Sequence, residues 1–509
     1  MASSRSARAG LVGAAAAALL LAACAPAPML QPPEAAERSQ PEQPADGLAP
    51  YYEQELDWTE CGDRHECARL SVPLDYDDPG GQSIEIALKV APATGSAQGP
   101  LVLNPGGPGG SGVELVESVD ATFSDDVVAA FDIVGFDPRG VGDSDAVRCL
   151  DDDELDEYYA TGFNPDSDAG WQDFLDSEAA YGEACAERTG TLLGFVDTDS
   201  SARDLDIVRA ALGQEELTYL GYSYGTYLGA VYAELFPGHV GRFVLDSAMD
   251  PSLSYAEVVR GQVGGFDQAY RSYLSDCMAG PECPFSGSQD EAVQDTIDLL
   301  SMLGSDPVPA GDPDRPVTDA DLFNAIMISM YNVQYWPVLT EAITMLMRDE
   351  DASVIRNMSD LALEREEDGS YRPDEGAFRA INCLDYPIDE VDREDSVEAA
   401  EQLVDLSPVF GRYMGYGEVG CATWPHESEN TRAPIAASGT PPILVIGITR
   451  DPATPHEWAE ALAEQLEAGI MLSYDGDGHT AYGTGNSCVH DAVDDFLLEG
   501  QVPPDGTEC

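Results

Sequence analysis

The sequence predicts an α/β fold, a mostly parallel sheet with helices on both faces. Short apolar runs alternate with amphipathic stretches up to about residue 250, and the alternation returns after 440. Between these regions strand-like runs are scarce and long amphipathic stretches prevail. We therefore expect a largely helical cap inserted between two parts of one sheet.

Two of the expected helices have candidate N-caps. Thr198, Asp199 and Ser200 are candidate caps for the helix expected at 202–212. Thr318 is a candidate N-cap for the helix that begins at 319. We expect strands at 84–90, 100–103, 131–136, 217–220, 242–245, 441–448 and 469–474, and helices at 202–212, 226–235, 319–330, 337–348, 456–466 and 489–498.

The composition of the 509 residues argues against nucleic-acid binding, and local sequence patterns divide the chain into segments. The formal net charge of -70, from 94 acidic and 24 basic side chains, repels nucleic acid and anionic lipid. We therefore expect no nucleic-acid partner. The segments are a signal peptide at 1–23, a Pro-rich tether at 24–50, a first core part at 51–250, the cap at 251–435 and a second core part at 436–509.

The N-terminus predicts export. Arg5 and Arg8 precede the apolar run 11–21, which is too short to span a bilayer and is typical of a secretory signal. The run ends in Leu21-Ala22-Ala23-Cys24, a pattern typical of a bacterial lipobox, in which the cysteine is lipidated. An ordinary cleavage site that contains a cysteine is the alternative. We expect a protein that is lipid-anchored to the outer face of the cell membrane or secreted.

Cysteine usage agrees with an oxidising compartment, because ten cysteines remain when Cys24 is set aside. A structural zinc site is the alternative, but the spacings lack paired C-x-x-C repeats. We expect neither a metal nor a cofactor. The simplest disulfides close short loops and pair Cys61 with Cys67, Cys149 with Cys185, Cys277 with Cys283, Cys383 with Cys421 and Cys488 with Cys509.

A serine flanked by glycines lies between a predicted strand and a predicted helix, in Gly221-Tyr222-Ser223-Tyr224-Gly225. A tight strand-to-helix turn leaves no room for side chains two residues before and after the serine, which Gly221 and Gly225 satisfy. Such a turn exposes the serine hydroxyl at the edge of the sheet. Ser223 is therefore the candidate nucleophile, with an ordinary glycine-flanked turn as the alternative.

The nucleophile needs a histidine base and a carboxylate that orients it. His479 lies in a Gly-flanked loop after the last predicted strand, unlike His65, His239, His426, His456 and His490. Asp451 follows the strand at 441–448 and is the candidate carboxylate. Asp475 and Asp477 are too near His479 in sequence to approach from a separate loop. Asp246, after the strand that follows the nucleophile, is a more serious rival.

An oxyanion-binding site requires backbone N–H donors. One should be the N–H of Tyr224, and the other should come from the Gly-rich loop 104–112 after an early strand. Gly107 is the first choice and Gly106 the reserve. A phosphate-binding loop is disfavoured, because no lysine follows these glycines.

Together these motifs resemble the tripeptidyl aminopeptidase-like branch of the prolyl-aminopeptidase family of α/β-hydrolases, over residues 55–509. From about 410 onward the chain is similar to the C-terminal segment of this branch. The resemblance depends on Asn104–Gly112, Asp137–Gly140, Gly221–Thr226, Leu245-Asp246 with Asp250-Pro251, Asn382–Asp385, Asp451-Pro452 with Thr454-Pro455, and Gly478–Thr480.

This resemblance implies an α/β-hydrolase fold and a triad of Ser223, Asp451 and His479. It also implies that the cap covers the active site and that acidic cap groups hold the free α-amine of a substrate. Asp385 and Glu390 are the candidates for that role. A solvated surface charge is the alternative for any carboxylate of so acidic a chain.

We therefore expect a monomeric, exported serine exopeptidase that releases short peptides, in particular tripeptides, from the N-termini of peptides through an acyl-enzyme. Its partner would be a peptide with a free N-terminus, and it would touch the membrane only through its lipid anchor. One alternative is a carboxylesterase of the cell envelope with the same fold. The other is a lipid-anchored binding protein on an inactive hydrolase scaffold, which the complete set of triad candidates disfavours.

Overall fold

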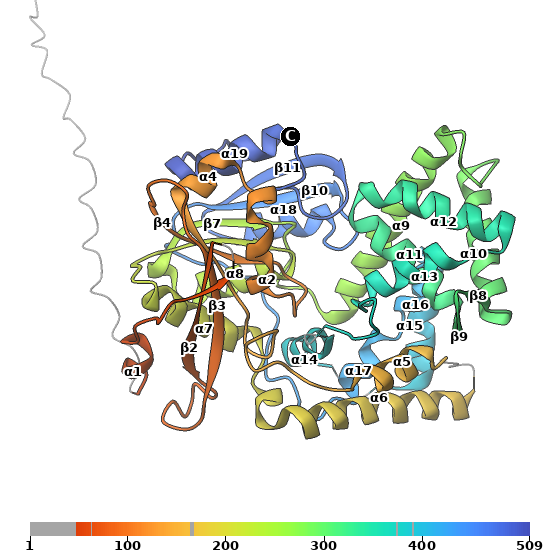
Figure 1. Ribbon diagram of the computed structural model, residues 1–509, viewed down its shortest axis with the longest axis horizontal. Helices are drawn as coiled ribbons and strands as arrows, with labels where there is room; N and C mark the ends of the chain where they lie inside the picture. Colours follow the sequence, from red (N-terminus) through yellow and green to blue (C-terminus); the bar gives the residue numbers. More distant parts are fainter. Residues whose placement is uncertain (1–46, 63, 163–166, 373–374, 389–390) are drawn as a thin grey trace, which may run out of the picture. The chain divides into compact units, whose positions relative to one another are not determined.

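A mixed sheet runs through the computed structural model of the chain (Figure 1). The structure describes residues 47–509 except 63, 163–166, 373–374 and 389–390, so the predicted signal peptide and Cys24 lie outside the described residues. In spatial order the strands are β1 (Thr59–Gly62), β2 (His65–Pro73), β3 (Ser83–Ala91), β5 (Phe131–Phe136), β4 (Gly99–Asn104), β6 (Leu217–Tyr222), β7 (Val240–Asp246), β10 (Ile443–Arg450), β11 (Gly469–Asp477) and β12 (Thr507–Glu508).

The strand order and directions are those of an α/β-hydrolase. The pairs β1–β2, β2–β3 and β3–β5 are antiparallel, and every later pair in the sheet is parallel. The chain passes from β4 to β5 on one side and then returns to β6 on the other, so the order reverses beside β4. Ligands of such sheets bind at the carboxyl ends of the strands near this reversal. The predicted fold is confirmed.

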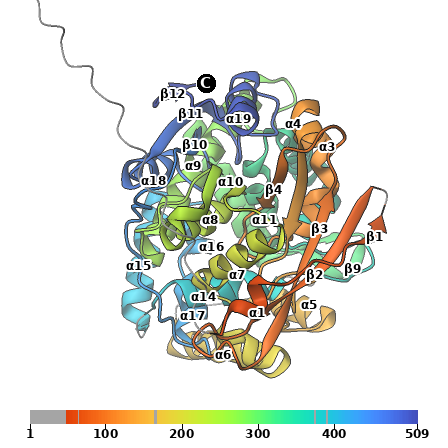
Figure 2. The ribbon, with the colours of Figure 1, turned by 90° about the vertical axis from the view of Figure 1, so that its left-hand side faces the viewer.

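Helices cover both faces of this sheet, because alternate strand residues point in opposite directions. On one face Phe243 and Leu245 belong to a buried cluster with residues of α7 (Thr198–Ala211), α8 (Tyr224–Leu235) and α18 (His456–Gln465). On the other face Val244 packs with residues of α4 (Asp125–Ala130) and α19 (Ser487–Glu499). Figure 2 shows α7 and α8 on one side of the strands, with α3 (Val119–Thr122) and α4 beyond them. The short helices α1 (Ala49–Tyr52) and α2 (Gly112–Leu115) complete this part.

A second buried cluster lies within the residues expected to form the cap. Its largest members include Phe266, Tyr270 and Phe410, and the rings of Phe266 and Phe410 stack with centroids 5.3 Å apart. The cap helices are α9 (Tyr255–Ala279), α10 (Gln289–Ser305), α11 (Asp319–Tyr331), α12 (Trp336–Asp349), α13 (Ser353–Ala362), α14 (Glu375–Asp385), α15 (Arg393–Leu406), α16 (Gly411–Met414) and α17 (Gly417–Ala422), with a hairpin of β8 (Val308–Ala310) and β9 (Asp312–Val317).

Two further helices come from the residues assigned to the first core part. These are α5 (Asp152–Ala160) and α6 (Asp168–Thr189), inserted between β5 and α7. Arg379 of α14 donates to Glu178 of α6 at 2.7 Å and to the Tyr158 hydroxyl of α5 at 2.8 Å. Residues from before the nucleophile therefore pack with the cap helices, an arrangement that the sequence pattern did not indicate. The segment boundaries themselves stay a proposal.

Most helices and strands lie within a few residues of their expected positions, and two boundaries differ. The cap of α7 is Asp197, whose carboxylate accepts the Ser200 N–H at 2.8 Å, so the expected caps at Thr198 to Ser200 were wrong by one to three residues. Thr318 is the N-cap of α11, as expected. β10 begins at Ile443 instead of 441, because Pro441 and Pro442 have no N–H to donate to a ladder.

Five disulfides tie neighbouring elements together with the expected pairing, as Cys61–Cys67, Cys149–Cys185, Cys277–Cys283, Cys383–Cys421 and Cys488–Cys509. Such bonds persist in oxidising compartments outside the cytoplasm. Each typically stabilises a fold by about 2–4 kcal/mol. Among the described helices, none has the length and apolar character needed to cross a bilayer.

Candidate active site

Ser223 lies in a strained turn between β6 and α8. Its φ of 54° and ψ of -123° are rare for a residue with a side chain. A Cβ on Gly221 would lie 2.4 Å from the Gly225 carbonyl oxygen, and one on Gly225 would lie 2.7 Å from Asn104 Oδ1. The turn therefore requires glycine at both positions. The Ser223 N–H donates to the Asp246 carbonyl of β7 at 2.9 Å, which fixes the turn to the next strand.

Asp451 and His479 are directly hydrogen-bonded, although 28 residues separate them. His479 Nδ1 lies 2.8 Å from Asp451 Oδ1 and 2.9 Å from Oδ2. A carboxylate acceptor places the imidazole proton on Nδ1, so Nε2 is left as the proton acceptor that a base requires. The Asp451 side chain is held by the N–H groups of Ala453 at 2.9 Å and Thr454 at 3.0 Å, and it is only 1% exposed.

A cap residue that sequence reasoning missed supports the base. The N–H of His479 donates to the carbonyl of Tyr331, the last residue of α11, at 2.9 Å. The Tyr331 ring meets the imidazole edge to face, with centroids 5.4 Å apart. The only signal in the sequence was the end of the helix expected at 319–330. The position of the imidazole thus depends on the cap as well as on the sheet.

Asp246, the rival carboxylate, has another task. It is fully buried and accepts the N–H groups of Ala481 at 3.0 Å and Tyr482 at 2.7 Å, while Ser247 Oγ accepts the Thr480 N–H at 2.9 Å. These bonds anchor the loop that carries the histidine. Burial raises the pKa of Asp246 to about 6, and the two backbone donors oppose that shift. The structure therefore favours Asp451 as the orienting group.

Opposing effects set the charge of His479. Burial disfavours the imidazolium and so lowers the pKa of His479. The charge and hydrogen bond of Asp451, together with the charge of Asp246, outweigh burial, so the pKa of His479 is raised above its ordinary value. This environment stabilises the imidazolium form of His479, the form that a general base adopts after it removes a proton.

The Gly-rich loop lies against the turn that carries Ser223. A Cβ on Gly106 would lie 2.5 Å from the Tyr222 carbonyl oxygen and 3.1 Å from the Tyr224 nitrogen. The N–H of Gly106 already donates to Asn104 Oδ1 at 3.0 Å, which favours Gly107 as the loop donor. Tyr224 is the first residue of α8, a position whose N–H has no acceptor within the helix.

Asp385 and Glu390 are the two carboxylates expected to bind a substrate amine. Glu390 lies outside the described residues. Asp385 is only 1% exposed, and its oxygens accept Thr198 N–H at 2.9 Å, Thr198 Oγ1–H at 2.5 Å and Asn430 Nδ2 at 3.1 Å. Burial raises the pKa of Asp385 to about 7 against the opposing bonds from Thr198. Its enclosure favours a positioning task over contact with a substrate.

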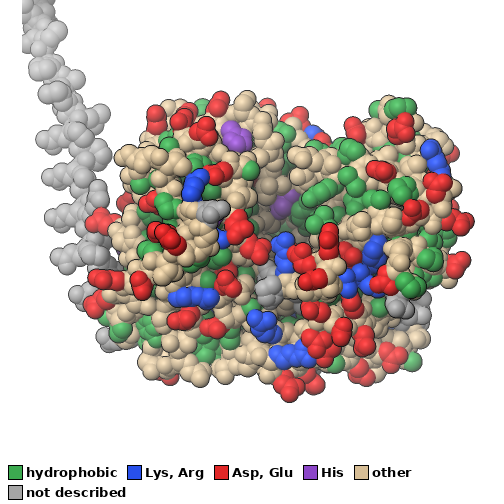
Figure 3. Space-filling model, in the orientation of Figure 1, with side chains coloured by type: hydrophobic (Ala, Val, Ile, Leu, Met, Phe, Trp, Pro, Cys, Tyr) green, Lys and Arg blue, Asp and Glu red, His purple; other side chains and the backbone are tan. Residues whose placement is uncertain are grey.

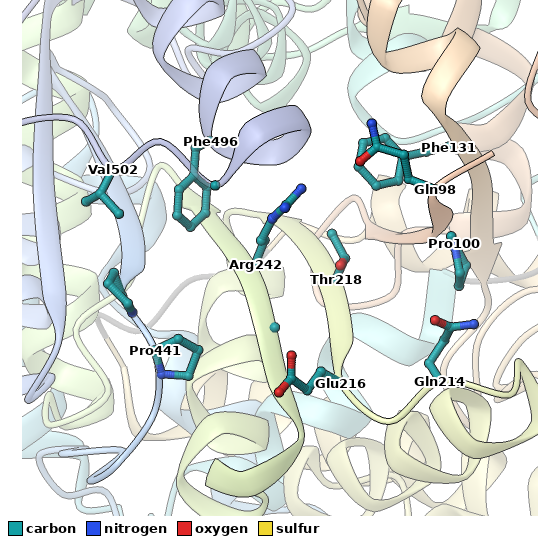
Figure 4. Close-up of a pocket in the computed structure, with 14 residues that line it drawn as sticks. Gln98, Pro100, Phe131, Gln214, Glu216, Thr218, Arg242, Pro441, Phe496 and Val502 are labelled. Atoms are coloured by element: carbon teal, nitrogen blue, oxygen red, sulfur yellow. The ribbon is translucent and has the colours of Figure 1, made fainter. Parts of the chain in front are cut away.

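Two hollows of the surface lie at different distances from the triad candidates. Between the sheet and the α9–α13 helices the surface is hollowed, and one histidine side chain is visible there (Figure 3). The pocket in Figure 4 lies instead at the amino ends of the parallel strands, lined by Gln98, Thr218 and Arg242 among others. Because Ser223 follows the carboxyl end of β6 and Thr218 lies near its start, this pocket is separate from the triad candidates. No group of three or more potential metal ligands converges in the described part of the chain.

Comparison with known proteins agrees with this geometry. A family model described as TAP-like protein matches residues 407–509. Carboxylesterase B from Mycobacterium tuberculosis is 37% identical over 497 residues, covering 95% of this chain and 95% of its own. Serine protease Hip1 from the same species is 35% identical over 90% of this chain and 91% of its own length. Tripeptidyl aminopeptidase from Streptomyces lividans is 30% identical, with 89% and 86% covered.

The His479–Asp451 pair predicts a pH dependence. The base must be neutral, so activity falls as pH drops through the raised pKa of His479. In Asp451→Asn the raising influences of the carboxylate are lost while burial remains. We expect the acidic limb of kcat/KM to move to lower pH and kcat to fall by about 10⁴-fold, because the imidazole adopts the wrong tautomer.

The measurement is a pH–rate profile from pH 4 to 9. Asp475→Asn is the matched control, because this exposed carboxylate is also close to His479 in sequence but pairs with Arg450 at 2.7 Å. The control should keep the wild-type profile. An unshifted acidic limb in Asp451→Asn would contradict the assignment.

Proposed function

Because the chain belongs to the tripeptidyl aminopeptidase-like family of α/β-hydrolases and is a serine hydrolase, we propose that Ser223, His479 and Asp451 form its catalytic triad. One observation carries the proposal above the others. The imidazole of His479 is hydrogen-bonded to the buried Asp451 at 2.8 Å and lies in a loop anchored to Asp246 of β7, the strand that also fixes the Ser223 turn. Three segments far apart in sequence thus supply a nucleophile, a base and its orienting acid.

The reaction follows from these roles. His479 Nε2 takes the proton of Ser223 Oγ as this oxygen attacks the scissile carbonyl carbon. The N–H groups of Tyr224 and Gly107 stabilise the resulting oxyanion. When the carbon–nitrogen bond breaks, the leaving amine takes the proton from His479, and an ester to Ser223 remains. Water then loses a proton to His479 as it attacks this ester, and His479 returns that proton to Ser223 Oγ when the bond between this oxygen and the acyl carbon breaks, which releases the acid.

The substrate is a peptide with a free N-terminus, from which the enzyme releases a short peptide, in particular a tripeptide. The relative named tripeptidyl aminopeptidase supports this choice. The net charge of -70 supports it as well, because the field of an acidic protein attracts an α-ammonium group. The enclosure of Asp385 favours Glu390, the other carboxylate expected in this role, as the group that receives the amine.

Ester hydrolysis is the second candidate function. The relative named carboxylesterase B is 37% identical along nearly the whole chain. The same nucleophile, base and oxyanion donors act on an ester, whose alkoxide leaving group requires less protonation than an amine. An esterase would also need no group that recognises an N-terminal amine.

Export with a lipid anchor completes the proposal. The lipobox-like pattern that ends at Cys24 and the disulfide pairing of the other ten cysteines support it. The anchor is then the chain's contact with the membrane.

We expect Cys24→Ala to release the protein from the membrane fraction of an expressing bacterium, because the modified thiol is absent. The distribution between membrane, medium and cytoplasm is followed by immunoblot, with Cys61→Ala as a control that should stay membrane-bound. A Cys24→Ala protein that remains in the membrane fraction as the wild type does would argue against the anchor.

A fluorophosphonate probe should label the purified wild-type protein, because the probe reacts with an activated serine. Ser223→Ala should abolish labelling, whereas Ser473→Ala should not, although Ser473 Oγ also lies 2.9 Å from a histidine nitrogen, that of His456. Gel fluorescence after a short incubation measures both. Equal labelling of wild type and Ser223→Ala would refute the nucleophile.

Comparison of blocked and free substrates separates the two functions. An Ala-Ala-Ala anilide should be hydrolysed at least about 100-fold faster than its N-acetylated form, the loss expected when a buried acceptor is left unpaired. Values of kcat/KM for both anilides and for a short acyl ester provide the test. Equal rates for the two anilides, with a faster ester, would favour the esterase instead.

A further inference from the structure

Asp385 joins the cap to the start of α7, the helix that precedes β6 and the Ser223 turn. It is the last residue of α14, and both of its oxygens accept hydrogen bonds from Thr198, the first residue of α7. The pair is 187 residues apart in sequence. Asn430 adds a third bond at 3.1 Å, and Asp385 and Thr198 are both buried. The carboxylate is therefore fixed from several directions inside the protein.

The hydroxyl of Thr198 continues the chain of hydrogen bonds. Thr198 Oγ1 lies 2.5 Å from Asp385 Oδ2 and 2.5 Å from the Tyr224 hydroxyl. The Thr198 hydroxyl donates its single proton to Asp385 Oδ2, so its lone pair receives the proton of Tyr224. The direction is thus Tyr224 to Thr198 to Asp385. Because Tyr224 is only 3% exposed, its hydroxyl is held in a place that water does not reach.

Tyr224 carries the backbone N–H assigned above to the oxyanion, and α14 also touches the loop that carries the other donor. A Cβ on Gly109 of that loop would lie 3.3 Å from Ala377 Cβ and 3.2 Å from the Phe378 nitrogen, both in α14. One turn of α14 thus touches the Gly-rich loop, while its last residue reaches Tyr224 through Thr198. A single cap helix is therefore linked to both sources of oxyanion donors.

We propose that Asp385 is a positioning residue that, through Thr198, fixes Tyr224 and so aligns the oxyanion-binding N–H groups with Ser223. This inference rests on the proposed function, because it assumes that the N–H of Tyr224 binds the oxyanion. The position of α14 against the core then determines the rate of the acylation step. An oxyanion donor displaced by about 1 Å loses much of its effect, on the order of 100-fold in rate.

Thr198 offers a matched pair of variants. Thr198→Ser keeps the hydroxyl and should keep kcat within about twofold of the wild type. Thr198→Val has nearly the same shape but no hydroxyl, and we expect kcat to fall by about 10- to 100-fold while KM changes by less than about threefold. Initial rates on the free Ala-Ala-Ala anilide give both constants, and melting curves confirm folding. A buried residue with only a structural task would not separate kcat from KM in this way.

Asp385 and Tyr224 offer a second test that does not depend on Thr198→Val being folded. Asp385→Asn keeps the shape but would donate to Thr198, which leaves the Tyr224 O–H without an acceptor. Tyr224→Phe removes that O–H alone. Each should lower kcat by about 10- to 100-fold, and the double variant should lose no more than the single ones, because all act through one chain of bonds.

Asp321→Asn is the matched control for a buried cap carboxylate. Asp321 accepts from Arg356 at 2.6 Å and has no bond to the Tyr224 chain, so this change should lower the melting temperature and leave kcat unchanged. Folded Thr198→Val and Asp385→Asn proteins with wild-type kcat would overturn the inference, as would losses that multiply in the Asp385→Asn, Tyr224→Phe double variant. Ser223→Ala, assayed in parallel, keeps the two proposals apart. Activity retained in Ser223→Ala would overturn the proposed function, whereas activity lost there but kept in Thr198→Val would overturn only the role of Asp385.

Discussion

The backbone of Ser223 is held at a φ of 54°, and the parts of the site are arranged around the turn that this conformation creates. A non-glycine residue in such a region costs on the order of 1–3 kcal/mol and persists only when its surroundings determine it. Here the surroundings are specific. The Asp246 carbonyl accepts the Ser223 N–H, and Gly106 allows the neighbouring loop to approach the turn closely. This close approach places the Gly-rich loop beside Ser223.

The histidine is positioned by contacts from separate parts of the fold. Asp451 after β10 holds the ring, Asp246 at the end of β7 and Ser247 just after it hold the loop behind it, and Tyr331 of the cap accepts its backbone N–H. A base on a loop would otherwise sample many orientations, and each would misplace the proton acceptor. The strand β7 is common to both arrangements, because it anchors the nucleophile turn through its last carbonyl and the histidine loop through side chains of the same region.

What the sequence could predict depended on whether a contact is local. The Ser223 turn, the strand before Asp451 and the loop of His479 are each visible within about ten residues, so these candidates and the mostly parallel sheet followed from the sequence. The choice between Asp451 and Asp246 required the distance to His479. The contacts of Tyr331 with His479 and of Thr198 with Asp385 could not be predicted, because they join cap and core across 148 and 187 residues. The location of α5 and α6 against the cap depends on similar long-range packing.

The contacts of one buried arginine extend this dependence to the helix that carries Thr198.

 Arg139 belongs to the Asp137–Gly140 motif, one of those that carry the resemblance to the family. Its side chain is fully buried, and its Nε and Nη2 both lie 2.7 Å from the carboxylate of Asp204 in α7. The remaining N–H groups donate to the carbonyls of Pro73, Leu74 and Phe195, so all five donors are satisfied.

A buried ion pair of this kind is weak evidence for net stability, because desolvation offsets much of its attraction. Its geometric consequence is more definite. Loss of one partner alone would leave an uncompensated charge in the interior, at a cost of about 3–5 kcal/mol. The pair therefore ties α7 to the ends of β2 and β5, and the first turn of the same helix presents Thr198 to Tyr224 and Asp385. In a chain with 24 basic residues against 94 acidic ones, this arginine is used where it fixes the helix that carries Thr198.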